Sequence, residues 1–142
     1  NSNRLEPAEI EIFDDIGEKV KIVKVFAGGN AAPTTTATTW GTCYAVDAQG
    51  NVYVWGNNNT TARHFGLNSA DVTITTPTRV PGISRISAIA TSKNVSANLR
   101  ATAYCGNSET GNSSIWTAGS ASNGMLGNSS TSPTYHFFLY HQ

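Results

Sequence analysis

Few side chains in this sequence are spaced for catalysis. Asp14-Asp15 places two carboxylates side by side, but it stands beside Gly17 in a turn-like stretch, which favours a solvated turn over a metal site. None of the histidines adjoins a Ser or Cys in a nucleophile motif. Gly28-Gly29 lacks the Lys and the helix start of a phosphate loop. The sequence therefore predicts no catalytic residue, no metal site and no cofactor.

The two cysteines leave two interpretations open. Cys43 and Cys105 belong to no CxxC motif, and no histidine stands at metal-ligand spacing from them. In a secreted protein they would be expected to pair as a disulfide. Each is equally suited to be a small buried hydrophobe.

Binding residues are expected in two loops, residues 30–41 and 57–64, because loops on rigid sheets commonly carry recognition. Trp40 is the aromatic residue of the first loop and is suited to stack on a sugar ring, although a packed Trp at the start of a strand is the alternative. The second loop offers hydrogen-bonding groups. The candidate ligand-binding residues are Trp40, Asn57, Asn58, Asn59, Arg63 and His64.

Charge and hydropathy exclude several classes of protein. Charged residues make up 13% of the 142 residues, and nine basic side chains balance nine acidic ones. Duplex nucleic-acid binders carry a basic excess, so we expect no nucleic-acid partner. No apolar run approaches the roughly 20 residues that span a bilayer, and no secretory leader is visible. The start at Asn1 without Met suggests a processed or excised part of a longer protein.

The composition favours strands and turns. The chain has 18 Thr, 14 Ser, 14 Asn and 13 Gly, which are poor helix formers. Such polar, weakly charged β-sequences are common in extracellular and virion-surface proteins, which is the location we expect. Alternating or β-branched runs predict strands over 9–13, 20–26, 42–46 and 51–55, with another over 83–89. The 42–46 and 51–55 runs are joined by a short Gly-containing turn and predict a hairpin.

An internal repeat is the strongest signal. Gly56 and Gly119 each end a strand-like run and lie 63 residues apart. Downstream, Gly66 and Gly127 lie in matching turns 61 residues apart. The approximate repeats are residues 7–76 and 77–133 of a single domain, followed by a terminal strand at 134–142. Four strand-like pieces in each copy are typical of β-propeller blades.

The first copy resembles the RCC1 repeat. The resemblance lies in Val25-Phe26-Ala27-Gly28-Gly29, in the run from Tyr44 through Asp47 and Gly50 to Tyr53-Val54-Trp55-Gly56, and in Thr76-Pro77-Thr78. The second copy is weaker, since Ala118 replaces the Trp. The resemblance implies an all-β chain holding two RCC1-like propeller blades.

Blades pack through alternate side chains of their strands, so we expect the large aromatic residues Tyr53, Trp55 and Trp116 to lie in the core. Two blades leave apolar faces uncovered. The chain is therefore an excerpt, pairs with other chains, or closes a ring with its own copies. We favour a homo-oligomer, with a trimer giving six blades. The last segment, 134–141, is expected to cross to a neighbouring sheet or to complete the first blade.

The sequence thus predicts a non-catalytic surface recognition module. It would act as an adhesin or as the receptor-binding tip of a phage or bacterial fibre, with a cell-surface glycan or protein as its partner. The family resemblance offers an alternative, an RCC1-like regulator of a small GTPase. A purely structural fibre or filament subunit is a third alternative.

Overall fold

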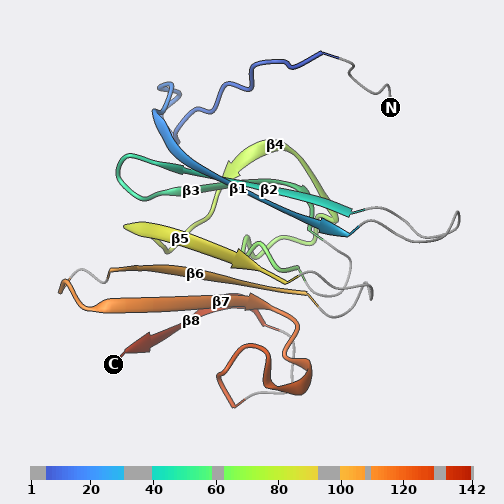
Figure 1. Cartoon of the computed structure of the whole chain (residues 1–142), viewed down its shortest axis with the longest axis vertical. Coiled ribbons are helices and arrows are strands. Elements are labelled where there is room, and N and C mark those ends of the chain that lie inside the picture. Colours follow the sequence, from blue (N-terminus) through green and yellow to red (C-terminus); the bar gives the residue numbers. More distant parts are fainter. Residues whose placement is uncertain are drawn as a thin grey trace, which may run out of the picture.

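The computed structural model describes residues 6–30, 40–58, 63–92, 100–107, 110–129 and 134–141, and these form two four-stranded antiparallel sheets (Figure 1). The predicted all-β class is confirmed. In each sheet every strand pairs with the one before it in sequence, in the orders β1-β2-β3-β4 and β5-β6-β7-β8. A short 3-10 turn, η1 (Ser122–Gly124), follows β7. The strands are β1 (Ile22–Asn30), β2 (Trp40–Asp47), β3 (Val52–Asn57), β4 (Thr73–Arg79), β5 (Ile86–Thr91), β6 (Ala101–Asn107), β7 (Ser113–Gly119) and β8 (Thr134–His141).

The predicted hairpin is present as β2 and β3, and the Asp47 side chain organises its turn. Asp47 Oδ1 accepts hydrogen bonds from the backbone N–H of Gln49 and Asn51, both at 2.9 Å. Its Oδ2 accepts a third from Asn51 Nδ2 at 2.8 Å. Gly50 takes φ +82°, a conformation that costs glycine little. The turn thereby fixes the register that pairs Val46 with Val52.

The main core lies between the two sheets. Strand alternation turns Tyr44, Val46, Val52 and Val54 of the first sheet toward the second, where all are at most 1% exposed. The ring of Tyr44 meets that of Tyr104 edge-on, with centroids 6.3 Å apart. Both phenols are buried with partners, since Tyr44 bonds Thr102 Oγ1 at 3.0 Å and Tyr104 donates to the Phe65 carbonyl at 3.0 Å. The core is therefore apolar without leaving these hydroxyls unsatisfied.

The expected core aromatics pack as predicted, but in different layers. Trp116 is buried between the sheets, whereas Tyr53 is buried on the opposite face of the first sheet. Trp55 is partly buried and packs against both clusters. Part of that opposite face is covered by the N-terminal segment, residues 6–21 (Figure 1). Ile12 of this segment packs with Ala45 and Tyr53 in a second, smaller apolar cluster.

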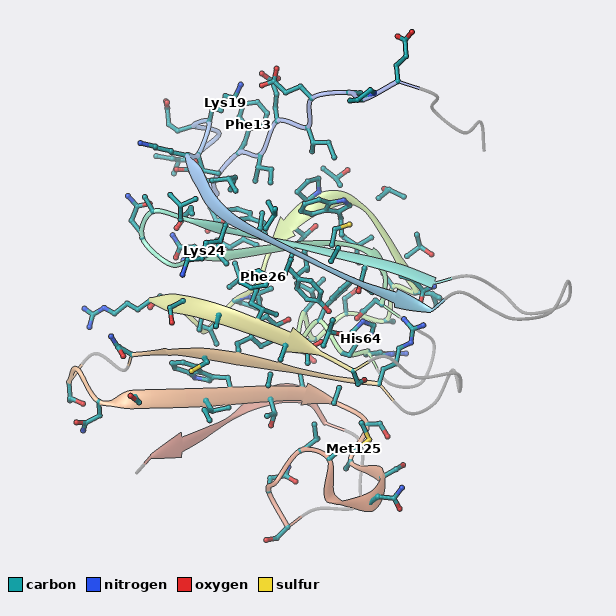
Figure 2. All side chains as sticks on the ribbon, in the orientation of Figure 1. Phe13, Lys19, Lys24, Phe26, His64 and Met125 are labelled. Carbon is teal, nitrogen blue, oxygen red and sulfur yellow. The ribbon has the colours of Figure 1, made fainter. Side chains whose placement is uncertain are left out.

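The predicted strand at 9–13 is wrong. The segment forms a single bridge, Phe13 to Lys19, because it lies across the face of the sheet and has no strand edge to follow. Its alternation of Glu and Ile serves another purpose. Glu9 and Glu11 both bind the Lys19 ammonium, at 3.1 and 2.9 Å, on the exposed side of the segment (Figure 2).

The two sheets repeat one another in backbone conformation. Gly66 and Gly127 have φ +73° and +67°, and Asn68 and Ser129, two residues further on, have φ +51° and +58°. The sheets divide between Arg79 and Ile86, so the boundary expected at residues 76 and 77 falls inside β4.

The expectation for the last segment is also wrong. β8 pairs antiparallel with β7 and completes the second sheet, so it neither crosses to another sheet nor completes the first. The chain between Gly119 and Thr134 is long enough to reverse direction and return along the free edge of β7.

A substitution at Gly56, which matches Gly119 in the repeat, tests whether the end of β3 requires glycine. Gly56 has φ +104°, and a Cβ at this position would clash with the Gly41 carbonyl. We expect Gly56→Ala to lower the free energy of unfolding by about 2 kcal/mol or more, because strain and overlap add. Gly41→Ala is the control, since nothing lies within 4 Å of its added Cβ. Equal denaturant midpoints for the two variants would contradict the requirement for glycine at position 56.

Candidate binding pocket

Of the residues expected to bind ligand, Trp40 and Asn57 lie at one end of the first sheet. Trp40 pairs with Asn30 at the start of β2, and Asn57 ends the neighbouring strand β3. The side chain of Trp40 and the whole of Asn59 lie outside the described residues. Asn57 and Arg63 are partly exposed, and Arg63 has φ +44°. The proposed roles of these four residues stay predictions.

Asn58 holds the loop that follows β3, and both polar groups of its side chain are hydrogen-bonded within the protein. It is 1% exposed. Its Nδ2 donates to the Asp71 carbonyl at 3.1 Å, and its Oδ1 accepts from the Phe65 N–H at 3.1 Å. The loop folds inward because Phe65 joins the core, and it takes Asn58 with it. Asn58 therefore has a structural role in this loop, and its predicted binding role stays a prediction.

His64 belongs to the same inward-folded loop, and its predicted binding role likewise stays a prediction. It is fully buried against the ring of Phe65, with ring centroids 4.8 Å apart, and it lies between the two sheets (Figure 2). Burial, together with the nearby charge of Arg100, lowers the pKa of His64 to about 3. The imidazole is therefore neutral at physiological pH and presents no nitrogen to solvent.

The two cysteines do not form a disulfide. Both are free thiols. Cys43 neighbours Tyr44 on β2 and Cys105 neighbours Tyr104 on β6, and both tyrosines face the core between the sheets. Alternation therefore turns the two sulfurs to opposite outer faces of the pair of sheets, too far apart to bond.

A pocket of about 420 Å³ lies at the opposite end of the first sheet, between the N-terminal segment and the β2–β3 turn. Two apolar side chains and seven polar ones line it. They are Asp14, Asp15, Ile16, Val20, Asp47, Gln49, Asn51, Tyr53 and Arg79.

Local hydrogen bonds build the rim of this pocket. Asp14 Oδ1 accepts from the backbone N–H of Ile16 at 3.0 Å and of Glu18 at 2.8 Å, which shapes the turn that the sequence predicted here. Asp15 then forms a 2.8 Å ion pair with Arg79 Nη1. Arg79 Nη2 donates to Asn51 Oδ1 at 2.9 Å. Arg79 thus links the N-terminal turn to the β2–β3 turn.

Tyr53 lines the pocket, and its buried hydroxyl has no hydrogen-bond partner among the described residues. The residue is 1% exposed, so water does not freely replace the missing partner. Burial raises the pKa of Tyr53, and the carboxylate of Asp47 raises it further, so the phenol keeps its proton. Such a buried unpaired hydroxyl costs about 1–3 kcal/mol, which a ligand that accepts its hydrogen bond would recover.

The lining combines hydrogen-bond acceptors with donors. It contains the carboxylates of Asp14, Asp15 and Asp47 and no Ser, Cys or His. Among the described residues, no group of three His, Cys, Asp or Glu side chains is placed to hold a metal ion. Carboxylate and amide oxygens accept hydrogen bonds, whereas Tyr53 and Arg79 donate them.

Sequence reasoning missed this pocket because its walls are distant in the chain. Asp15 and Arg79 are 64 residues apart, and no local motif connects them. Asp14-Asp15 was expected to be a solvated turn, Tyr53 a core residue, and Asn51 a part of the hairpin. Each of those expectations holds locally, and only the fold brings the residues together.

Comparisons of the chain with protein-family models, with curated proteins and with solved structures found no match. The assignment of function depends on the geometry of the pocket and of the two sheets.

The buried state of His64 predicts a pH dependence of stability. An unfolded histidine takes up a proton below pH 6.5, whereas the folded one does so only near pH 3. Protonation therefore favours the unfolded state in this window, and the free energy of unfolding should fall by up to about 1.4 kcal/mol per pH unit from this group as the pH drops. Denaturant unfolding of the parent chain and of His64→Leu, measured from pH 7 to 4, isolates the effect. Parallel pH profiles would contradict it.

Proposed function

We propose that the chain is a non-catalytic recognition module that binds a polyhydroxylated ligand, a glycan of a cell surface, in the pocket beneath the Asp14-Asp15 turn. One observation carries the proposal, namely a pocket lining in which carboxylate and amide acceptors lie beside Tyr53, whose hydroxyl has no hydrogen-bond partner among the described residues. A sugar hydroxyl accepts from such a phenol and at the same time donates to a carboxylate. The pocket supplies both kinds of group.

The apolar part of the lining supports the same class of ligand. Ile16 and Val20 lie beside the polar groups. A sugar ring has a C–H face that packs on apolar side chains and hydroxyls around its edge, so it matches a mixed wall of this kind. An isolated ammonium would meet the carboxylates but would also face the guanidinium of Arg79 and gain nothing from the phenol proton.

For the architecture, we propose that the two sheets are neighbouring blades of an RCC1-like β-propeller completed by self-association, with a trimer as the favoured state. Two consecutive four-stranded meanders with matching positive-φ positions support this proposal. The pair also exposes apolar side chains on both outer faces, at Val25 (72%) and Ile115 (45%).

The proposed setting is the outside of a cell or virion, as the tip of a fibre. The weakly charged, Thr- and Asn-rich composition supports it. In such a tip, several weak sites gain avidity by binding one surface together. The described residues contain no helix of the length and hydropathy needed to cross a membrane.

Removal of the Tyr53 hydroxyl tests the binding site. We expect Tyr53→Phe to weaken binding of the best ligand on a glycan array by about tenfold, the value of one hydrogen bond. Folding should not suffer, because the hydroxyl has no partner in the free protein. Tyr104→Phe is the control. It removes a hydrogen bond to the Phe65 carbonyl, so it should lower stability and leave binding unchanged.

The outcome separates the candidate functions. An unchanged affinity of the Tyr53→Phe variant would contradict binding of the ligand in this pocket. Absence of any glycan ligand would favour the purely structural fibre subunit, and accelerated nucleotide release from a small GTPase would favour the regulator.

A further inference from the structure

The outward side of the second sheet, opposite its core side, carries an apolar strip. We call this the open face. Strand alternation from the buried Tyr104 and Trp116 assigns to it Ala103, Cys105 and Ile115. Ile115 is 45% exposed and Cys105 is also exposed. Exposed apolar side chains that are paired across two strands indicate a surface that a partner covers.

Each residue of this strip has a counterpart in the first sheet that is buried. The strand ends at Gly56 and Gly119 align the sheets, since Gly56 pairs with Thr42 and Gly119 with Ala101. Counting back along the strands from these ends, the pair Cys105 and Ile115 corresponds to Val46 and Val52. Those two are 1% and 0% exposed. They are buried because the second sheet covers them.

The surface of the second sheet that covers Val46 and Val52 also has a counterpart, which lies in the first sheet. Within the chain, the second sheet presents Ile89, Tyr104 and Trp116, which are paired side by side across β5, β6 and β7. The corresponding row of the first sheet is Val25, Ala45 and Tyr53, also paired side by side. This row defines the outer face of the first sheet. Val25 is 72% exposed there, whereas its counterpart Ile89 is 9% exposed.

The N-terminal segment covers Ala45 and Tyr53 of this row and leaves Val25 exposed. It resembles the linker between the sheets, in which Val80 and Ile83 are buried on either side of Gly82 with φ +75°. In the segment, Ile12 and Val20 pack against the first sheet on either side of Gly17 with φ +84°. Residues 6–11, which precede this linker-like part, are exposed and can move without loss of core contacts.

We infer that the open face binds the outer face of the first sheet of a second copy of this chain, and that this contact repeats the interface between the two sheets within one copy. The inference rests on the proposed architecture of two equivalent blades. It names the surfaces through which the copies associate. The outer face of the first sheet includes Tyr53, which also lines the glycan pocket, so the two proposed sites share one side of that sheet.

The native cysteines provide the experiment. Within the chain, the Tyr44 hydroxyl reaches Thr102 at 3.0 Å, and Tyr44 shares its face of β2 with Val46. In the contact between copies, Cys105 of the first copy occupies the position that Val46 has within one chain. Cys43 of the second copy occupies the position of Thr102. A short bismaleimide should therefore join Cys105 of one copy to Cys43 of the next. Peptide mapping of ¹⁴N/¹⁵N mixed chains identifies links between copies.

The matched control moves one thiol off the open face. Cys105→Ser/Ser84→Cys keeps two thiols, with the new one in the exposed linker between the sheets. We expect Cys43–Cys105 links between copies in the parent chain, and at least a tenfold loss of linked species in the control. Equal yields in the two chains, or links within one copy only, would overturn the inference.

The mass in solution gives a second, independent readout. We expect light scattering to show an oligomer for the parent chain and for Ser84→Lys, and a monomer for Ile115→Lys, since a charge would be buried only at the open face. A monomeric parent chain, or an oligomer that survives Ile115→Lys, would overturn the inference. Glycan binding by monomeric Ile115→Lys would show that the pocket functions without the assembly, so the two proposals can fail separately.

Discussion

Apolar side chains on both faces of each sheet constrain the whole molecule. In β2, Tyr44 and Val46 point to one side and Ala45 to the other, and all three are buried. A sheet of this kind needs cover on two sides, and one neighbouring sheet supplies only one. Within the chain, the second sheet covers one face of the first, and the N-terminal segment covers part of the other. The open face of the second sheet remains.

The same constraint accounts for the pocket. Because the N-terminal segment must cross the outer face of the first sheet to bury Ile12, it passes close to the β2–β3 turn. The Asp15–Arg79 ion pair connects the segment to the sheet, although both side chains are well exposed, so the pair adds orientation more than stability. The space left between segment and turn is polar, with Tyr53 buried at its side. The binding site is thus a consequence of how the first sheet is covered.

Periodicity and turn chemistry predicted much of the fold. The hairpin of β2 and β3 followed from two β-branched runs around a Gly turn, and the repeat followed from glycines that the structure shows in matching left-handed conformations. Residues 9–13 alternate like a strand but have no edge to pair with, and alternation alone cannot reveal that. Asn58 and His64 were expected in a surface loop, yet Phe65 draws that loop into the core. The pocket joins positions 64 residues apart and required the fold itself.

The most direct test of the account is the location of a bound sugar, followed by amide chemical shifts as the best ligand of a glycan array is titrated into the ¹⁵N-labelled chain. If the sugar binds in the pocket, saturable amide shift changes are expected on both of its walls, at Ile16, Asn51, Tyr53 and Arg79. Shifts confined to the far end of the first sheet, around Asn57 and Arg63, would contradict it and return the binding site to the loops that the sequence first indicated.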